Sequence, residues 1–176
     1  MNAKRLAIIV GAILVVSFII YSWLGGFTDP ELGLAEQPAY QLIGTEYRGV
    51  FNHPRVRTLF DEARTKVTEQ GTGAIGIFYP EGDQPTQDTL SRFIGYWPGK
   101  VNRLRPENLA KVVQADKAVV VTLSMHPLVM PDKAEVREMA ARFASEQGLR
   151  LSEQNLELYF PDNRMEIIFF PEGSSL

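Results

Sequence analysis

The sequence predicts an α+β fold. Two strand–helix–strand–strand halves with pseudo-two-fold symmetry are expected to form a central cleft, and one N-terminal transmembrane helix is expected to precede them. Three observations lead to this expectation. Residues 6–24 form an uncharged apolar run. The order of extended and helical segments then repeats after about 78 residues. Each half holds one helical apolar stripe and three short strands, so the bare sheet faces of the two halves are expected to meet.

Composition narrows the functional classes. The chain has 176 residues, and the part that follows the N-terminal run and the segment after it is long enough for one domain. A formal net charge of −3 argues against a general nucleic-acid partner, which would need a basic surface to displace counterions. The chain has no Cys and two His, so disulfides and thiolate metal sites are excluded and a His-rich metal site is not expected. No cofactor is expected.

The apolar run is interpreted as an uncleaved signal anchor over residues 6–24. Its length of about 19 residues suits the hydrocarbon core of a bilayer, and Tyr21 and Trp23 are typical of membrane interfaces. A cleaved secretory signal is the alternative, but residues 22–27 lack a small-residue cleavage pattern. Lys4 and Arg5 then predict a single-pass protein with residues 1–5 in the cytoplasm and the domain outside.

The remaining boundaries follow from composition. Residues 25–38 are rich in Gly, Pro and acidic side chains and are predicted to be a linker. Residues 39–172 are predicted to be the domain, and residues 173–176 a tail.

In the first half, residues 40–48 are predicted as a strand. Residues 52–54 open a helix, because Pro54 is tolerated in a first turn, and Gly71 ends it. Strands over residues 74–79 and 91–97 follow. The apolar side chains of this helix have the spacing of one face, and they are Val56, Leu59, Phe60, Ala63 and Val67.

The second half repeats this order. Residues 118–123 are β-branched and predict a strand equivalent to residues 40–48. Asp132 and Glu135 form a capping box, which begins a helix that ends at Gly148. Residues 156–160 and 165–170 are the last two strands. The larger helix residues expected beneath the sheets are Leu59, Phe60, Val67, Met139 and Phe143.

Two further patterns have plain interpretations. The glycines at 71, 73 and 76 match a dinucleotide-binding string, but they follow a helix and open a strand, whereas the real motif does the reverse. A helix stop and a tight turn explain them. His53 and His126 each precede a proline at equivalent places, and a loop histidine near a helix cap is preferred to a catalytic base.

Glu157 is the most informative polar residue. Alternation places Leu156, Leu158 and Phe160 on one strand face, expected to meet the helix, and Glu157 and Tyr159 on the other. If that second face lines the cleft, the carboxylate needs a cationic partner or a raised pKa. If the face is solvated, Glu157 has no special role. Further candidates for a ligand-binding site are aromatic residues on strands, namely Tyr47, Tyr79, Tyr96 and Trp97.

Residues 40–172 resemble the GyrI-like small-molecule-binding domain, which is also the effector-binding domain of multidrug-sensing regulators. The similar segments are Ile75-Gly76-Ile77-Phe78-Tyr79-Pro80, Leu156-Glu157-Leu158-Tyr159 and Ile167-Ile168-Phe169-Phe170-Pro171. The resemblance implies that Glu157 points into a central pocket and meets cationic or amphiphilic ligands. The chain lacks a DNA-binding module, so the resemblance does not extend to a transcription regulator.

The preferred functional hypothesis is a membrane-tethered protein that binds hydrophobic, cationic small molecules, without turnover. One alternative is a hydrolase of small electrophilic compounds, with Glu157 and Tyr159 as the catalytic acid/base pair. Another is an adaptor that docks a protein partner on the surface of the domain.

Overall fold

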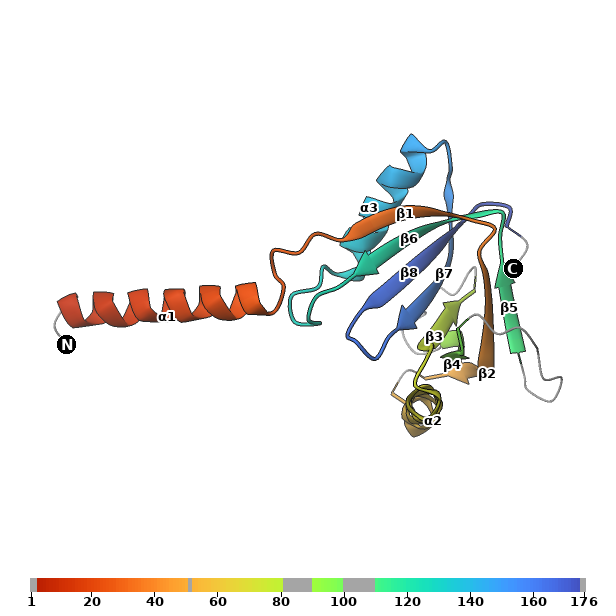
Figure 1. The fold of residues 1–176 in the computed structure, drawn as a ribbon, viewed down its shortest axis with the longest axis horizontal. Helices are drawn as coiled ribbons and strands as arrows, with labels where there is room; N and C mark the ends of the chain where they lie inside the picture. The colour runs from red at the N-terminus through yellow and green to blue at the C-terminus, as the bar shows by residue number, and fades with distance from the viewer. Residues whose placement is uncertain (1–2, 51, 81–89, 100–109, 175–176) are drawn as a thin grey trace.

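The computed structural model describes residues 3–50, 52–80, 90–99 and 110–174. Within these ranges, an antiparallel sheet of eight strands curves into a half-barrel beside three helices (Figure 1). The helices are α1 (Ala3–Trp23), α2 (Pro54–Gln70) and α3 (Lys133–Glu146). The strands are β1 (Glu31–Glu36), β2 (Ala39–Gly49), β3 (Ala74–Tyr79), β4 (Leu90–Trp97), β5 (Ala110–Gln114), β6 (Lys117–Leu123), β7 (Leu151–Tyr159) and β8 (Met165–Pro171).

The strand order in the sheet is symmetric about its centre. It runs β1-β6-β8-β7-β3-β4-β2-β5, so β7 and β3 form the central pair, and equivalent strands follow on both sides. The edge strands are exchanged between the halves. β1 precedes β2 in the chain but pairs with β6, and β5 precedes β6 but pairs with β2. Each half is therefore a strand–strand–helix–strand–strand unit whose first strand completes the sheet of the other half.

The predicted fold, two three-strand halves around a central cleft with a transmembrane helix, is wrong, because the structure is one half-barrel sheet of eight antiparallel strands. The expected units had three strands each, and the two edge strands were missed. β1 lies inside the segment that was predicted to be a linker, and β5 had no predicted counterpart. Both are short, and β1 contains a glycine and has a glutamate at each end, so neither has a strong strand signal of its own. Pairing with strands distant in the sequence supplies their structure.

The N-terminal part of the prediction is also corrected. Across the described part of the chain, no helix meets the combined requirement of length and apolar character for crossing a bilayer. The predicted transmembrane helix over residues 6–24 is therefore wrong, and so is the single-pass localisation derived from it. Helix α1 projects away from the sheet (Figure 1), and many of its large apolar side chains are exposed.

Both helices of the domain begin and end where their sequence signals predict. His53 caps α2 by accepting a hydrogen bond from the Arg55 N–H, and Gly71 ends it with φ of 66°. Asp132 and Glu135 form the predicted capping box of α3. The predicted apolar stripes face the sheet. Their small and β-branched members are buried, and the larger ones are half-buried, namely Leu59, Phe60, Met139 and Phe143.

The two faces of the sheet have different partners. Helix α2 packs on Tyr47, Ile77 and Ile94, and α3 packs on the alternate residues of β6 and β8. The opposite face carries a separate cluster from both halves, which includes Leu42, Phe78, Leu156, Leu158 and Phe170, and none of its described members belongs to a helix. The curved sheet therefore folds this bare face onto itself, and the helices cover the other face.

A row of glycines crosses three neighbouring strands. Gly44, Gly95 and Gly76 lie opposite one another on β2, β4 and β3. A β-carbon at Gly44 would overlap the Ile94 carbonyl oxygen, one at Gly95 would overlap the Ile43 carbonyl oxygen, and one at Gly76 would lie 2.6 Å from Leu42 Cδ2. The absence of β-carbons thus permits the close approach of backbone and core here. It also accounts for Gly76 in the glycine string.

We predict that Gly95→Ala lowers the free energy of unfolding by about 1–3 kcal/mol, because the added methyl group meets rigid backbone. Gly33→Ala on edge strand β1 is the matched control, since a β-carbon there has open space, and its effect should stay within about 0.5 kcal/mol. Urea unfolding followed by circular dichroism measures both. Equal effects of the two substitutions would contradict the proposed close approach.

Candidate functional site

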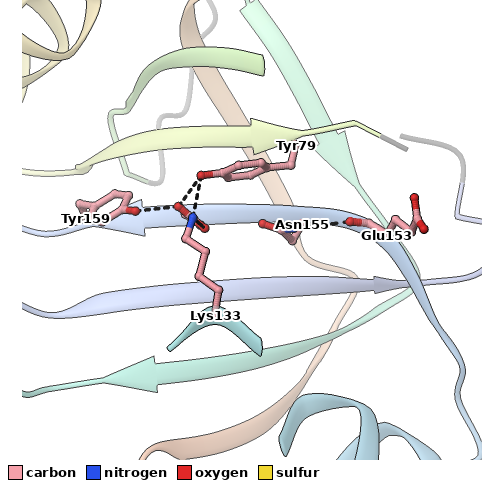
Figure 2. Close-up of polar contacts among 6 residues, drawn as sticks. Tyr79, Lys133, Glu153, Asn155 and Tyr159 are labelled. Carbon is pink, nitrogen blue, oxygen red and sulfur yellow. Dashed lines mark hydrogen bonds and ion pairs between the residues drawn. The ribbon is translucent and has the colours of Figure 1, made fainter. Parts of the chain in front are cut away.

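The carboxylate of Glu157 is the centre of a buried polar network. Glu157 lies on β7 and is only 2% exposed. Its Oε2 accepts hydrogen bonds from the hydroxyls of Tyr79 at 2.8 Å and Tyr159 at 2.6 Å. Its Oε1 accepts a hydrogen bond and ion pair from Lys133 Nζ at 2.6 Å, and Lys133 Nζ also donates to Tyr79 Oη at 3.0 Å (Figure 2). Three donors therefore satisfy this buried acid.

Three elements from both halves bring these side chains together. β3 and β7 pair so that Ile77 is opposite Glu157 and Tyr79 is opposite Asn155. Tyr79 and Glu157 are consequently diagonal neighbours on one sheet face, which is within reach of a long aromatic side chain. Tyr159 is two residues beyond Glu157 and shares its face. Lys133 is the first residue of α3 and reaches down to the same carboxylate (Figure 2).

The ring of Tyr79 is close to two side-chain cations. Lys133 Nζ is 4.9 Å from its centroid, and Arg92 Cζ on the neighbouring strand β4 is 4.4 Å from it. Both distances are within the range of cation–π attraction. The site thus combines a buried carboxylate with an aromatic face that already attracts positive charge.

A cavity of about 650 Å³ adjoins this network. Helix α2, the beginning of α3 and strands β2, β3, β4 and β7 bound it. Its size suits a small molecule, and apolar and aromatic side chains make up much of its wall. The lining side chains are Tyr47, Asn52, His53, Pro54, Val56, Arg57, Phe60, Ile77, Tyr79, Arg92, Ile94, Lys133 and Tyr159.

The structure brings four of the six candidate residues to this cavity or its network. Tyr79 and Tyr159 line the cavity and bind Glu157. Tyr47 also lines it, and its hydroxyl donates to the Val50 carbonyl at 2.7 Å. Tyr96 lines a different cavity of about 670 Å³ between α2 and strands β2 and β4.

The sixth candidate, Trp97, is on the opposite face of the sheet. There it packs against Tyr40 and Phe160, with ring centroids 5.7 Å and 6.3 Å away. It therefore contributes to the core beneath the bare face and not to the cavity. Adjacent residues on one strand point to opposite faces, which explains why Tyr96 and Trp97 lie on different faces of the sheet.

The predicted side of the Glu157 strand is corrected. Leu156 and Leu158 do alternate with Glu157, but they lie in the cluster that contains no helix residue. Tyr159 instead packs against the clusters beneath both α2 and α3. The reason is that the bare faces of the two halves pack on each other, so that the site lies between helix and sheet.

Lys133 was missed among the candidate residues. A cationic partner for Glu157 was expected, but the residue that supplies it could not be identified from the sequence. One signal was present. An ammonium group in the first turn of a helix meets the positive end of the helix dipole, so a lysine at that position calls for an external partner.

The two histidines have matching local roles. His53 Nδ1 accepts from the Arg55 N–H at 3.2 Å, and His126 Nδ1 accepts from the Leu128 N–H at 3.3 Å. The interpretation as a loop histidine at a helix cap is confirmed for His53, which also lines the cavity, whereas His126 lies in a turn and caps no described helix. Among the described residues, no group of three or more acidic or histidine side chains is placed to hold a metal ion.

The pKa of Tyr159 is raised well above its usual value of 10. Burial is the largest cause, the negative charge of Glu157 is the next, and nearby Arg92 opposes the shift. Tyr159 therefore remains a protonated donor to Glu157 at physiological pH. Burial, with a contribution from Glu166, likewise raises the pKa of Tyr40 to about 12 on the other sheet face.

The chain matches no protein-family model, and no curated protein matches it. Several solved structures do match. An integron cassette protein from the mobile metagenome of Vibrio cholerae is 13% identical, with 80% of this chain and 95% of that chain covered and a TM-score of 0.45. The protein SAV2435 bound to tetraphenylphosphonium is 12% identical, with 81% and 94% covered and a TM-score of 0.41.

A hydrolase from Listeria innocua is 16% identical, with 84% of this chain and 92% of that chain covered and a TM-score of 0.43. With TM-scores below 0.5, these likenesses carry no conclusion about the function of this chain. The resemblance to GyrI-like domains stays a prediction.

We predict that the stability contributed by Tyr159 is present below pH 10 and is lost as the pH rises through its raised folded-state pKa. Above pH 10 the unfolded chain loses this proton and the folded protein keeps it, so the free energy of unfolding falls by about 1.4 kcal/mol per pH unit from this group. Tyr159→Phe should therefore show a shallower decline between pH 10 and 11.5. Urea unfolding across pH 8–11.5 tests this, and parallel curves would contradict it.

Proposed function

We propose that the cavity between α2 and the beginning of α3 binds an apolar small molecule that carries a positive charge, with Glu157 as its counterion. The observation that carries this proposal is the position of one buried carboxylate directly behind an aromatic cavity wall. A buried charge is costly unless it is compensated, and here the compensating cation is the exposed side chain of Lys133, so a ligand cation could take its place beside the carboxylate.

The cavity wall supports the apolar part of the ligand. Val56 and Phe60 from α2 face Ile77 and Ile94 from the sheet across this space. Each 100 Å² of apolar ligand surface removed from water would contribute about 2.5 kcal/mol. Tyr79 and Tyr159 could add cation–π attraction of about 0.5–2 kcal/mol each where water is excluded. Together these contributions favour lipophilic cations over small hydrated ones.

Positive side chains at the cavity favour a competing occupant, an organic anion. Arg57 is exposed on α2, and Arg92 and Lys133 also line the cavity. Arg57 and Lys133 are exposed, so salt screens their charges and they contribute less than a buried group, whereas Arg92 is half-buried. We therefore favour the cation, and an anionic probe belongs in the test.

The hydrolase alternative has weaker support. A general base needs an oxygen within reach of the proton that it abstracts. Both oxygens of Glu157 already accept hydrogen bonds, and Tyr159 is an acid too weak for ready proton release. Binding without turnover suits these contacts better.

We predict that Glu157→Gln weakens the binding of a cationic trimethylammonium dye by about 30-fold or more. The affinity for its neutral tert-butyl isostere should change by less than about threefold. The amide keeps the shape of the side chain and removes the charge, and loss of a buried charge partner costs about 2–5 kcal/mol. Isothermal titration calorimetry measures both probes. Glu46→Gln, an exposed carboxylate on β2, is the control and should change neither affinity.

The outcomes separate the hypotheses. Equal losses for both probes, with a native circular dichroism spectrum, would show that Glu157 supports the cavity without recognising charge. Tight binding of a sulfonate analogue of the dye, with no binding of the cation, would favour the anion and refute the proposal.

A further inference from the structure

Lys133 already fills a site for a cation. Its ammonium group is 2.6 Å from Glu157 Oε1, 3.0 Å from Tyr79 Oη and 4.9 Å from the centroid of the Tyr79 ring. A carboxylate, a hydroxyl and an aromatic face are the groups that would hold the charged end of an organic cation. A ligand cation and the lysine ammonium group would therefore compete for one place.

The two partners of this ion pair differ sharply in burial. The side chain of Lys133 is 66% exposed, whereas that of Glu157 is 3% exposed. Lys133 can therefore swing into solvent on its flexible four-carbon stem without uncovering a core, and its ammonium group is readily rehydrated there. Glu157 has no such freedom, because β7 holds it beneath Tyr79 and Tyr159. The lysine is the mobile partner of a fixed site.

The beginning of α3 does not retain the ammonium group. Lys133 follows the capping residue Asp132, and the carboxylates of Asp132 and Glu135 are engaged with backbone N–H groups of the capping box. The positive end of the helix dipole disfavours a cation at this position. The attraction that keeps Lys133 in place comes from Glu157 and Tyr79 alone among its described hydrogen-bond and ring contacts.

We propose that Lys133 is a tethered competitor that sets the specificity of the cavity. This inference rests on the proposed function of the same site. A tethered group has an effective concentration in the millimolar range or above, so it outcompetes cations that would bind through their charge alone. A ligand displaces Lys133 only when its apolar groups also fill the space beside Ile77 and Phe60. The lysine thereby selects lipophilic organic cations against simple ammonium compounds.

The consequence for affinity is measurable. If Lys133 occupies the site nine-tenths of the time, the apparent affinity for a competing cation is about tenfold weaker than the intrinsic one. Removal of the ammonium group should restore that factor. A neutral ligand, which does not compete for the carboxylate, should gain nothing.

The test uses Lys133→Met, which keeps the length of the side chain and removes its charge. At pH 8 we expect this variant to bind the trimethylammonium dye about tenfold more tightly and its neutral isostere within threefold of the unsubstituted protein. Tetramethylammonium, too small to fill the cavity, should bind measurably only to the variant. Lys66→Met is the matched control, since Lys66 forms a 2.9 Å ion pair with exposed Glu69, and it should change no affinity.

A second measurement does not depend on a variant. In the unsubstituted protein labelled at the lysine ε-carbon, the Lys133 resonance should move to the position of a solvated lysine as the dye saturates the site. Unchanged Lys133 signals at saturation, or unchanged or weaker dye binding by Lys133→Met, would overturn the inference. If Glu157→Gln still abolished dye binding in that case, the proposed function would stand. If no cation bound either protein, both would fail.

Discussion

The antiparallel pairing of β3 with β7 is the contact on which the rest of the domain depends. It joins two sheets of equivalent design into one, and it brings Tyr79 from the first half beside Glu157 and Tyr159 from the second. A shift of this register by one residue would send Tyr79 to the opposite sheet face, away from the carboxylate. The geometry of the site and the union of the halves are thus consequences of the same ladder of hydrogen bonds.

The curvature of the sheet decides which face can hold a polar site. On the inner face, large side chains from both halves fill the space, and the glycine row lets strands approach closely there. That packing is mostly apolar, and the charged residue Glu166 lies on the same face only half-buried. On the outer face, α2 and α3 cover different parts of the sheet, and the space between them admits Tyr79, Tyr159 and a cavity. The polar network lies where two helices fail to meet.

Local signals in the sequence predicted the elements that carry their own information. The capping box of α3, the glycine stop of α2 and the strand over residues 74–79 were all found where expected. Glu157 was singled out because a charged residue between apolar neighbours on a strand is rare. Alternation also correctly separated it from Leu156 and Leu158.

Features that depend on contacts between distant parts of the chain could not be predicted from the sequence. β1 and β5 are strands because β6 and β2 lie beside them. The side of the sheet that meets the helices depends on how the two halves pack. Alternation separates the two faces of a strand but does not determine which of them meets a helix. Lys133 could not be assigned to Glu157, because the approach of α3 to β7 is a tertiary contact. Trp97 is an aromatic residue at the correct strand position but on the wrong face.

The exchange of the edge strands has a consequence for how the chain reaches its native state. Because β1 pairs Glu31 with Thr122 and β5 pairs Ala39 with Gln114, neither repeat can finish its own sheet. The internal duplication is therefore not modular, since an isolated repeat would present an unpaired strand edge. Such interleaved, long-range pairing raises the contact order and favours slow, all-or-none folding of the whole domain. We therefore expect the domain to unfold as a single cooperative unit.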